Sequence, residues 1–160
     1  MRARRGAAVL LSGAVLAAAL PAAACFGTRL RVGVPADRTW ALAAYATGYY
    51  VEEKAGVEPE FVRVEDPAAA LGKGRVDLVL VPAGGGAPPG AVARPAGEVP
   101  GLGRIQFWVR EAVLEDLRYS LVDRALGRVG ELFRSQAYAD AWAGHGPPRR
   151  AARQAVLDAL

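Results

Sequence analysis

The spacing of hydrophobic and polar positions predicts a strand and then a helix after residue 29. Residues 30–35 (LRVGVP) are strand-like, and Asp37 stands in the following turn as a candidate N-cap. The helix is predicted over 39–55, and Gly56 suits its C-terminal cap. One face of this helix carries apolar side chains at helical spacing, namely Leu42, Tyr45, Ala46 and Tyr49.

The same alternation continues through a second strand, a short helix and a third strand. Residues 60–64 alternate, and Asp66-Pro67 starts a helix predicted over 67–71. Residues 76–81 (VDLVLV) are almost wholly apolar, as expected of a strand covered on both faces. Short strand–helix–strand connections predict a parallel sheet with right-handed crossovers and the spatial order 2-1-3. The fold class is therefore α/β, a single doubly wound, flavodoxin-like lobe.

Residues 82–103 interrupt this pattern with many Gly, Pro and Ala residues. They have no periodicity and are predicted to form a flexible loop. Gly84-Gly85-Gly86 has the composition of a phosphate-binding turn, but no Lys-Ser/Thr follows, which favours a linker. A further strand is predicted over 105–109.

The remainder of the chain is predicted to be helical. Ser120 and Asp123 form a candidate capping box, and Ser135 is a candidate cap for a helix that ends at Ala143. The final helix is predicted over 148–160, with Ala152, Ala155, Val156 and Leu160 on one side. The helix after Ser120 carries an apolar stripe of Val122, Ala125, Leu126, Val129, Leu132 and Phe133.

The first residues have the pattern of an export signal. Basic residues precede an apolar run over 6–20, and Pro21-Ala-Ala-Ala offers a cleavage site. We predict a signal peptide over 1–24 and a tether over 25–29. Cys25 is the only cysteine, and Ala-Ala-Ala-Cys resembles a bacterial lipobox, so lipidation of Cys25 and a membrane anchor in the cell envelope are predicted. Ordinary cleavage and an uncleaved Ala-rich anchor are the alternatives.

Charge and side-chain inventory favour neither nucleic-acid binding nor catalysis. The formal net charge is +4, and three of the arginines lie in the predicted signal peptide, which leaves about +1 for the rest. His145 is the only histidine, and the serines after the leader are both candidate caps. We therefore predict no enzyme activity, no metal site and no cofactor.

Several stretches resemble the first lobe of type II periplasmic solute-binding proteins, the receptors of ABC transporters. The helix ends in Glu53-Lys54-Ala55-Gly56, and Leu71, Gly74 and Asp77 reproduce the phrase aL-x-x-G-x-x-D that follows. These motifs are most similar to those of the glycine-betaine and phosphonate branches of this family. The C-terminal ALGRVGELFRSQAYADAWAG also resembles the closing helices of these receptors.

The resemblance implies two lobes with the ligand between them, but this chain has room for one. About twenty residues separate the third and fourth strands, whereas a domain needs at least about 50 residues. The resemblance then implies a reduced, one-lobe relative in which 105–109 is an antiparallel strand beside the third. An ABC-transporter permease or another envelope protein is the implied partner.

Ligands of open α/β sheets lie outside the carboxyl ends of the strands, at the switch point. The candidate binding residues are therefore Asp37, Arg38, Thr39 and Trp40, with Ala83 and Gly84 opposite. The helix N-terminus and Arg38 suit an oxyanion, and Trp40 with Trp108 suits a quaternary ammonium. The alternatives are that Asp37 only caps the helix, Arg38 is solvated, and the aromatic residues are core.

Two functions follow as hypotheses. The first is an exported solute-binding protein that binds a small zwitterion or oxyanion. The second is an envelope interaction module that has lost solute binding.

Overall fold

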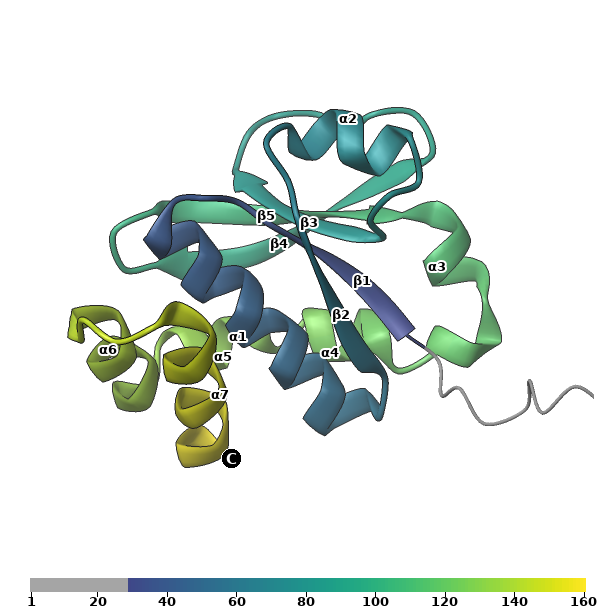
Figure 1. Cartoon of the computed structure of the whole chain (residues 1–160). Coiled ribbons are helices and arrows are strands. Elements are labelled where there is room, and N and C mark those ends of the chain that lie inside the picture. Colours follow the sequence, from purple (N-terminus) through teal and green to yellow (C-terminus); the bar gives the residue numbers. More distant parts are fainter. Residues whose placement is uncertain (1–28) are drawn as a thin grey trace, which may run out of the picture.

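The computed structural model describes residues 29–160 (Figure 1). The predicted signal peptide (1–24) and Cys25 lie outside these residues. No helix in the described part is both long and apolar enough to cross a bilayer. The elements are β1 (Arg29–Val34), α1 (Arg38–Ala55), β2 (Glu58–Arg63), α2 (Pro67–Gly72), β3 (Leu78–Pro82), β4 (Ala91–Val99), β5 (Gly103–Arg110), α3 (Glu111–Glu115), η1 (Leu117–Tyr119), α4 (Val122–Leu126), α5 (Val129–Phe133), α6 (Gln136–Ala143) and α7 (Pro148–Ala159).

The strands form one open sheet in the order β2-β1-β3-β5-β4. β1 is parallel to both β2 and β3, whereas β5 is antiparallel to β3 and to β4. β4 therefore runs in the same direction as the first three strands. The α/β class, the order 2-1-3 and the antiparallel strand beside the third are confirmed.

The caps predicted for the first two helices are present. The Asp37 carboxylate accepts hydrogen bonds from the backbone N–H groups of Thr39 and Trp40, at 2.9 and 3.1 Å. Gly56 ends α1 with a φ of 68°, where a side chain would be strained, and its N–H donates to the Glu52 carbonyl. Asp66 caps α2 through Ala69 N. Local residue chemistry thus fixes both ends of α1 and the start of α2.

The flexible loop predicted over 82–103 is wrong for residues 91–99, which form the edge strand β4. It pairs with β5 along its whole length and has a register shift between Pro95 and Gly97. The sequence AVARPAGEV contains few β-branched residues, so its strand character comes from backbone pairing and from packing on α5. Gly130 of α5 lies so close to this strand that a Cβ there would be 3.0 Å from the Ala96 carbonyl oxygen. Residues 83–90 keep the predicted irregular form.

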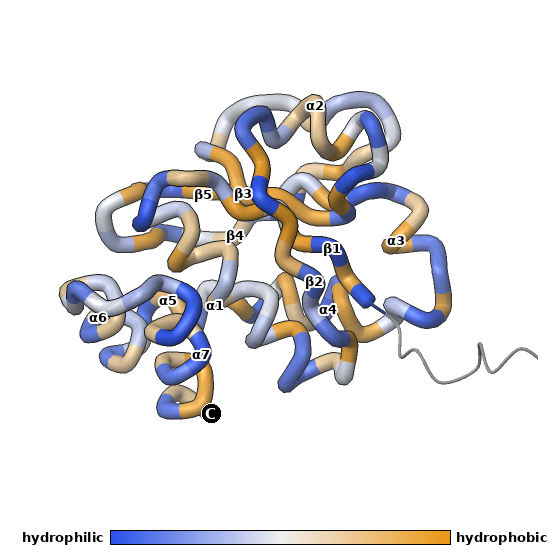
Figure 2. Tube along the Cα trace, viewed as in Figure 1, coloured by the Kyte–Doolittle hydropathy of each residue, from blue (hydrophilic) through white to orange (hydrophobic). Residues whose placement is uncertain are grey.

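Helices cover the two faces of the sheet unequally, as Figure 1 shows: α2 lies on one side, and α1, α4, α5 and α7 lie on the other. β3 is buried on both faces, because Leu78 and Leu80 join the main core whereas Val79 and Val81 join the smaller cluster under α2. Figure 2 shows the corresponding concentration of hydrophobic residues along the central strands. The prediction of a strand covered on both faces is confirmed.

The predicted apolar stripe is buried at all six positions, but it belongs to two short helices. The chain turns at Gly127-Arg128 between α4 and α5.

The predicted capping box is wrong, because Ser120 ends η1 and no side chain caps α4. Ser135 caps α6 through Tyr138 N, as predicted. In α7, Ala152, Ala155 and Val156 are buried, whereas Leu160 is exposed, contrary to the prediction.

Candidate functional site

The start of α1 is occupied by its own residues. The Asp37 carboxylate already accepts from Thr39 N and Trp40 N, two of the backbone N–H groups at the start of the helix, and it places a negative charge in front of them. Thr39 is half-buried in the first turn. An anion at this helix end would compete with Asp37, so the N-terminus of α1 is a poor oxyanion site.

Arg38 is directed along the edge of the sheet to the connection between α6 and α7. Its guanidinium donates to the backbone carbonyls of Trp142 at 3.3 Å, of Gly146 at 3.5 Å, and of Gly144. Arg38 is thus neither aimed at a ligand nor simply solvated. It fastens the C-terminal helices to the start of α1.

The two tryptophans predicted to share a ligand lie on opposite faces of the sheet. Trp40 packs against the main core under α1, and Trp108 packs against the cluster under α2. Ala83 and Gly84 are exposed in the turn after β3, where Ala83 N donates to the Arg104 carbonyl. These residues do not converge with Trp40 on a common cavity. The structure therefore divides the predicted site into separate pieces.

A depression of about 260 Å³ does lie at the carboxyl ends of β1 and β2, the edge where a ligand was expected. Arg63 at the end of β2 is its only charged lining residue, and the Arg63 guanidinium makes no hydrogen bond or ion pair among residues 29–160. Phe61 lies two positions earlier, on the same face of the strand. The lining comprises Val34, Pro35, Ala36, Ala41, Tyr45, Phe61, Arg63 and Pro148.

The aromatic wall of the depression joins α1 to the edge strand. The Tyr45 and Phe61 rings meet edge to face, with centroids 4.7 Å apart. Gly48 permits this approach, since a Cβ there would lie 2.6 Å from the Phe61 ring.

The Phe61 ring also holds a cation from α7. The Arg149 guanidinium lies 5.4 Å from its centroid and donates to the Tyr49 hydroxyl at 3.0 Å. This hydrogen bond is the main reason that the pKa of Arg149 is raised above its ordinary value. A second positive charge therefore stands just behind the aromatic wall of the depression.

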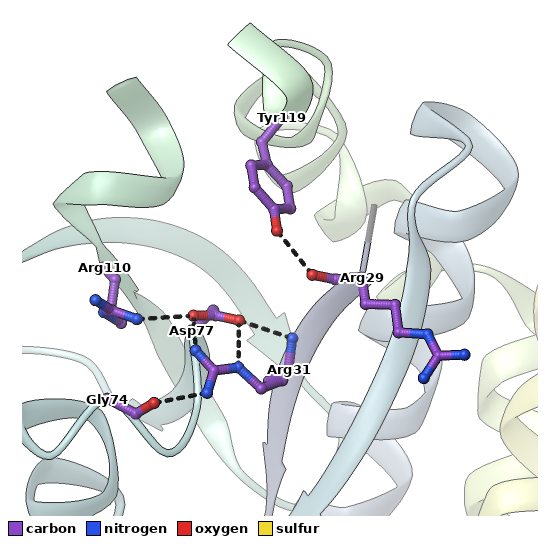
Figure 3. Close-up of polar contacts among 6 residues, drawn as sticks. All are labelled: Arg29, Arg31, Gly74, Asp77, Arg110 and Tyr119. Atoms are coloured by element: carbon purple, nitrogen blue, oxygen red, sulfur yellow. Dashed lines mark hydrogen bonds and ion pairs between the residues drawn. The ribbon is translucent and has the colours of Figure 1, made fainter. Parts of the chain in front are cut away.

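The most connected polar group is Asp77, at the opposite, amino-terminal edge of the sheet (Figure 3). Its carboxylate accepts from Arg31 N, Nε and Nη2 at 2.8–3.0 Å and from Arg110 Nη1 at 3.2 Å. The side chain is 6 % exposed, against about a third for each arginine. The bond to Asp77 is also the main reason that the pKa of Arg31 is raised.

The surroundings of Asp77 give it a structural role. Arg31 also donates to the Gly74 carbonyl at 2.7 Å, so the cluster joins β1, β3, β5 and the turn after α2. Nearby, the Tyr119 hydroxyl donates to the Arg29 carbonyl at 2.8 Å (Figure 3), and burial is the main reason that the pKa of Tyr119 is raised. Because all the acceptor positions face donors of the protein itself, the carboxylate has no place for a substrate.

Sequence reasoning missed Tyr45, Phe61 and Arg63 as a group. The three come from different elements, and only the register of β2 against β1 brings them to one edge. An arginine near the carboxyl end of a predicted strand, Arg63, is the signal in the sequence that could have added it to the candidates at this edge. Among residues 29–160, no group of three or more His, Cys, Asp or Glu side chains is arranged to hold a metal ion.

Comparison of the chain with protein-family models, with curated proteins and with solved structures finds no match. The resemblance to solute-binding proteins therefore stays a prediction from the sequence.

Proposed function

We propose that the protein is an exported, lipid-tethered protein of the solute-binding type, reduced to one α/β lobe, which binds a small organic oxyanion. The site is the depression at the carboxyl ends of β1 and β2. The antiparallel strand beside β3 supports this proposal, since the resemblance implies it.

The observation that carries the proposal is Arg63. It is the only charged group lining the depression and has no protein partner in the described chain, so a ligand oxyanion meets a guanidinium with free donors. Charge-assisted hydrogen bonds from arginine to carboxylate, phosphonate or sulfonate groups are short and strong.

The rest of the lining favours an apolar substituent on the anion. Val34, Pro35, Tyr45 and Phe61 offer hydrocarbon and ring surface, and the volume suits a ligand smaller than a drug-sized molecule. A zwitterion is disfavoured, because none of the described residues that line the depression is acidic and the Arg149 guanidinium already lies against the Phe61 ring. A ligand ammonium group would be repelled by Arg149.

Weak binding is expected. The depression is open to water, and no second lobe within 29–160 closes over it, so polar contacts stay in competition with solvent. We expect dissociation constants on the order of 1 mM, which corresponds to about 4 kcal/mol.

The test is calorimetric titration of the full chain in detergent micelles with butylphosphonate, inorganic phosphate and glycine betaine. We expect butylphosphonate to bind most tightly and Arg63→Gln to weaken it about tenfold. Arg104→Gln is the matched control, because Arg104 is exposed at the same edge but does not line the depression. No binding at tens of millimolar, or equal binding by the Arg63→Gln chain, would refute the proposal.

The alternative, an interaction module, is favoured by one observation. Several small uncharged residues are exposed at the carboxyl edge, among them Ala36, Ala83 and Gly84, and the Trp142 indole lies against Gly101. Such a surface suits another protein surface, for example a permease or a second copy of the chain. Sedimentation equilibrium and pull-down from envelope extracts test it, and a strict monomer without partners contradicts it.

A further inference from the structure

Two leucines on one short segment are exposed although the segment itself is held firmly. Leu117 is 88 % exposed and Leu121 is 45 % exposed. Asp116 caps η1 through Arg118 N at 2.9 Å and also accepts from the Arg118 side chain. The Tyr119 hydroxyl fastens the same turn to the start of β1. The exposure is therefore built into the fold and does not come from a frayed end.

A cation-lined depression of about 340 Å³ adjoins Leu121. Lys54 from the end of α1 and Arg124 and Arg128 from the α4 region line it, against a single acid, Glu131. Neither Arg124 nor Arg128 forms an ion pair or a side-chain hydrogen bond in the part of the chain that the structure describes. We call Leu117, Leu121, Lys54, Arg124 and Arg128 the basic leucine patch.

The patch lies at the end of the molecule where residues 1–28 join the fold. Tyr119 bonds to the Arg29 carbonyl, and α1 ends just before Glu58, which is the register partner of Arg29. If Cys25 carries the predicted lipid anchor, the four peptide steps to Arg29 span at most about 14 Å. An apolar run over 6–20 precedes it in the sequence. A membrane anchor at Cys25 would therefore hold this end of the lobe near the bilayer.

We propose that the basic leucine patch docks on an anionic phospholipid surface. Exposed leucines enter the interface between headgroups and acyl chains, and the arginines and Lys54 bind headgroup phosphates. A basic surface with exposed apolar side chains adds a second contact to that of a lipid anchor and fixes the orientation of the lobe on the bilayer. The docked lobe would turn its carboxyl edge away from the membrane. This inference does not depend on the proposed solute site.

The experiment measures the accessibility of single positions in the full chain, reconstituted in vesicles of phosphatidylcholine with or without phosphatidylglycerol. The Leu117→Cys and Ala36→Cys chains are reacted with a water-soluble maleimide, and the unsubstituted chain gives the Cys25 background. Ala36 is the matched control, since it is exposed at the opposite edge. We expect phosphatidylglycerol to slow the reaction at position 117 at least about fivefold and at position 36 less than about twofold.

A second pair of variants separates lipid docking from other causes. Arg124→Gln with Arg128→Gln should abolish the slowing at position 117, whereas Arg104→Gln with Arg75→Gln should preserve it. Equal rates at position 117 in both kinds of vesicle overturn the proposal. So does slowing that survives the Arg124 and Arg128 changes, or slowing that appears in concentrated protein without vesicles, which identifies a second copy as the occupant.

Discussion

At the residue scale, two buried polar groups differ in whether they have hydrogen-bond partners. The Asp77 carboxylate accepts hydrogen bonds from arginines of two strands, β1 and β5, whereas the Tyr138 hydroxyl is buried without a hydrogen-bond partner among residues 29–160. A satisfied buried carboxylate stabilises only while its partners remain, and an unsatisfied hydroxyl costs free energy throughout. The two residues therefore predict opposite responses to small substitutions.

Asp77→Asn is expected to lower the free energy of unfolding by about 2–3 kcal/mol, because Arg31 and Arg110 lose the carboxylate that holds them together. Asp123→Asn, which breaks an exposed ion pair with Arg94, should change it by less than about 1 kcal/mol. Urea unfolding followed by circular dichroism measures both. Equal small effects would show that the Asp77 cluster does not hold β1, β3 and β5 together.

Tyr138→Phe should leave stability at neutral pH within about 1 kcal/mol or increase it, since no hydrogen bond is lost. Burial raises the pKa of Tyr138 above its ordinary value of 10.0. The folded state therefore releases the phenol proton less readily than the unfolded chain, and stability is lost as the pH rises above about 10. Thermal melts from pH 8 to pH 11 should show a smaller alkaline loss in the Tyr138→Phe chain, because one such group contributes at most about 1.4 kcal/mol per pH unit. Tyr119→Phe, which loses a real hydrogen bond, should be destabilised at neutral pH.

At the scale of elements, close approaches between backbones determine how α5 packs on β4. α5 reaches β4 only because residue 130 is glycine, and β4 bends at Gly97, whose φ is 106°. These contacts hold in the sheet an edge strand whose own sequence has little strand preference. Packing, more than local propensity, therefore makes 91–99 a strand.

Gly130→Ala is expected to cost about 1–2 kcal/mol despite the better helix propensity of alanine, because the new methyl group meets a rigid backbone carbonyl at 3.0 Å. Gly127→Ala is the matched control: its Cβ would make only ordinary contacts at 3.5 Å, so it should be neutral or slightly stabilising. Hydrogen exchange of β4 amides, read beside denaturant unfolding, should show faster exchange in the Gly130→Ala chain alone.

The same contrast explains how much of the structure was predictable. The first three strands and two helices were found because Asp37, Gly56 and Asp66 are local signals that act on the next few residues. β4 was missed because its stabilising contacts come from β5 and α5, and its own sequence contains no local signal that predicts them. The partners of Asp77 lie 46 and 33 residues away, and Tyr45, Phe61 and Arg63 meet only through the parallel register of β1 and β2.

At the scale of the whole molecule, the C-terminal helix α7 packs against the N-terminal helix α1. α7 packs Ala152 and Val156 into the main core beside α1, Ala155 is also buried, and the Arg153 guanidinium lies 4.9 Å from the Tyr49 ring centroid. Arg38 ties the connection before α7 back to the start of α1. We therefore expect residues from both ends of the described chain to unfold together.

A chain that stops after Gly146 is expected to lose at least about 3 kcal/mol of stability, because the apolar face shared by α1 and α7 becomes exposed. A chain that stops after Leu157 loses only exposed residues and should change by less than about 0.5 kcal/mol. Guanidinium titrations compare the two. A single unchanged transition for both would mean that α7 folds as a separate unit.

The uninterrupted α1 has a further consequence. Its 18 residues contain no proline and form a rod of about 27 Å, with Ala41 and Tyr45 beside the Arg63 depression and Lys54 at the far end. A helix of fixed length acts as a spacer. If the Lys54 end of α1 rests on a flat support, the opposite end lies at a fixed distance from that support. A ligand that binds at Arg63 must then approach at about that distance from the support, and only a tilt of the entire lobe can change this distance.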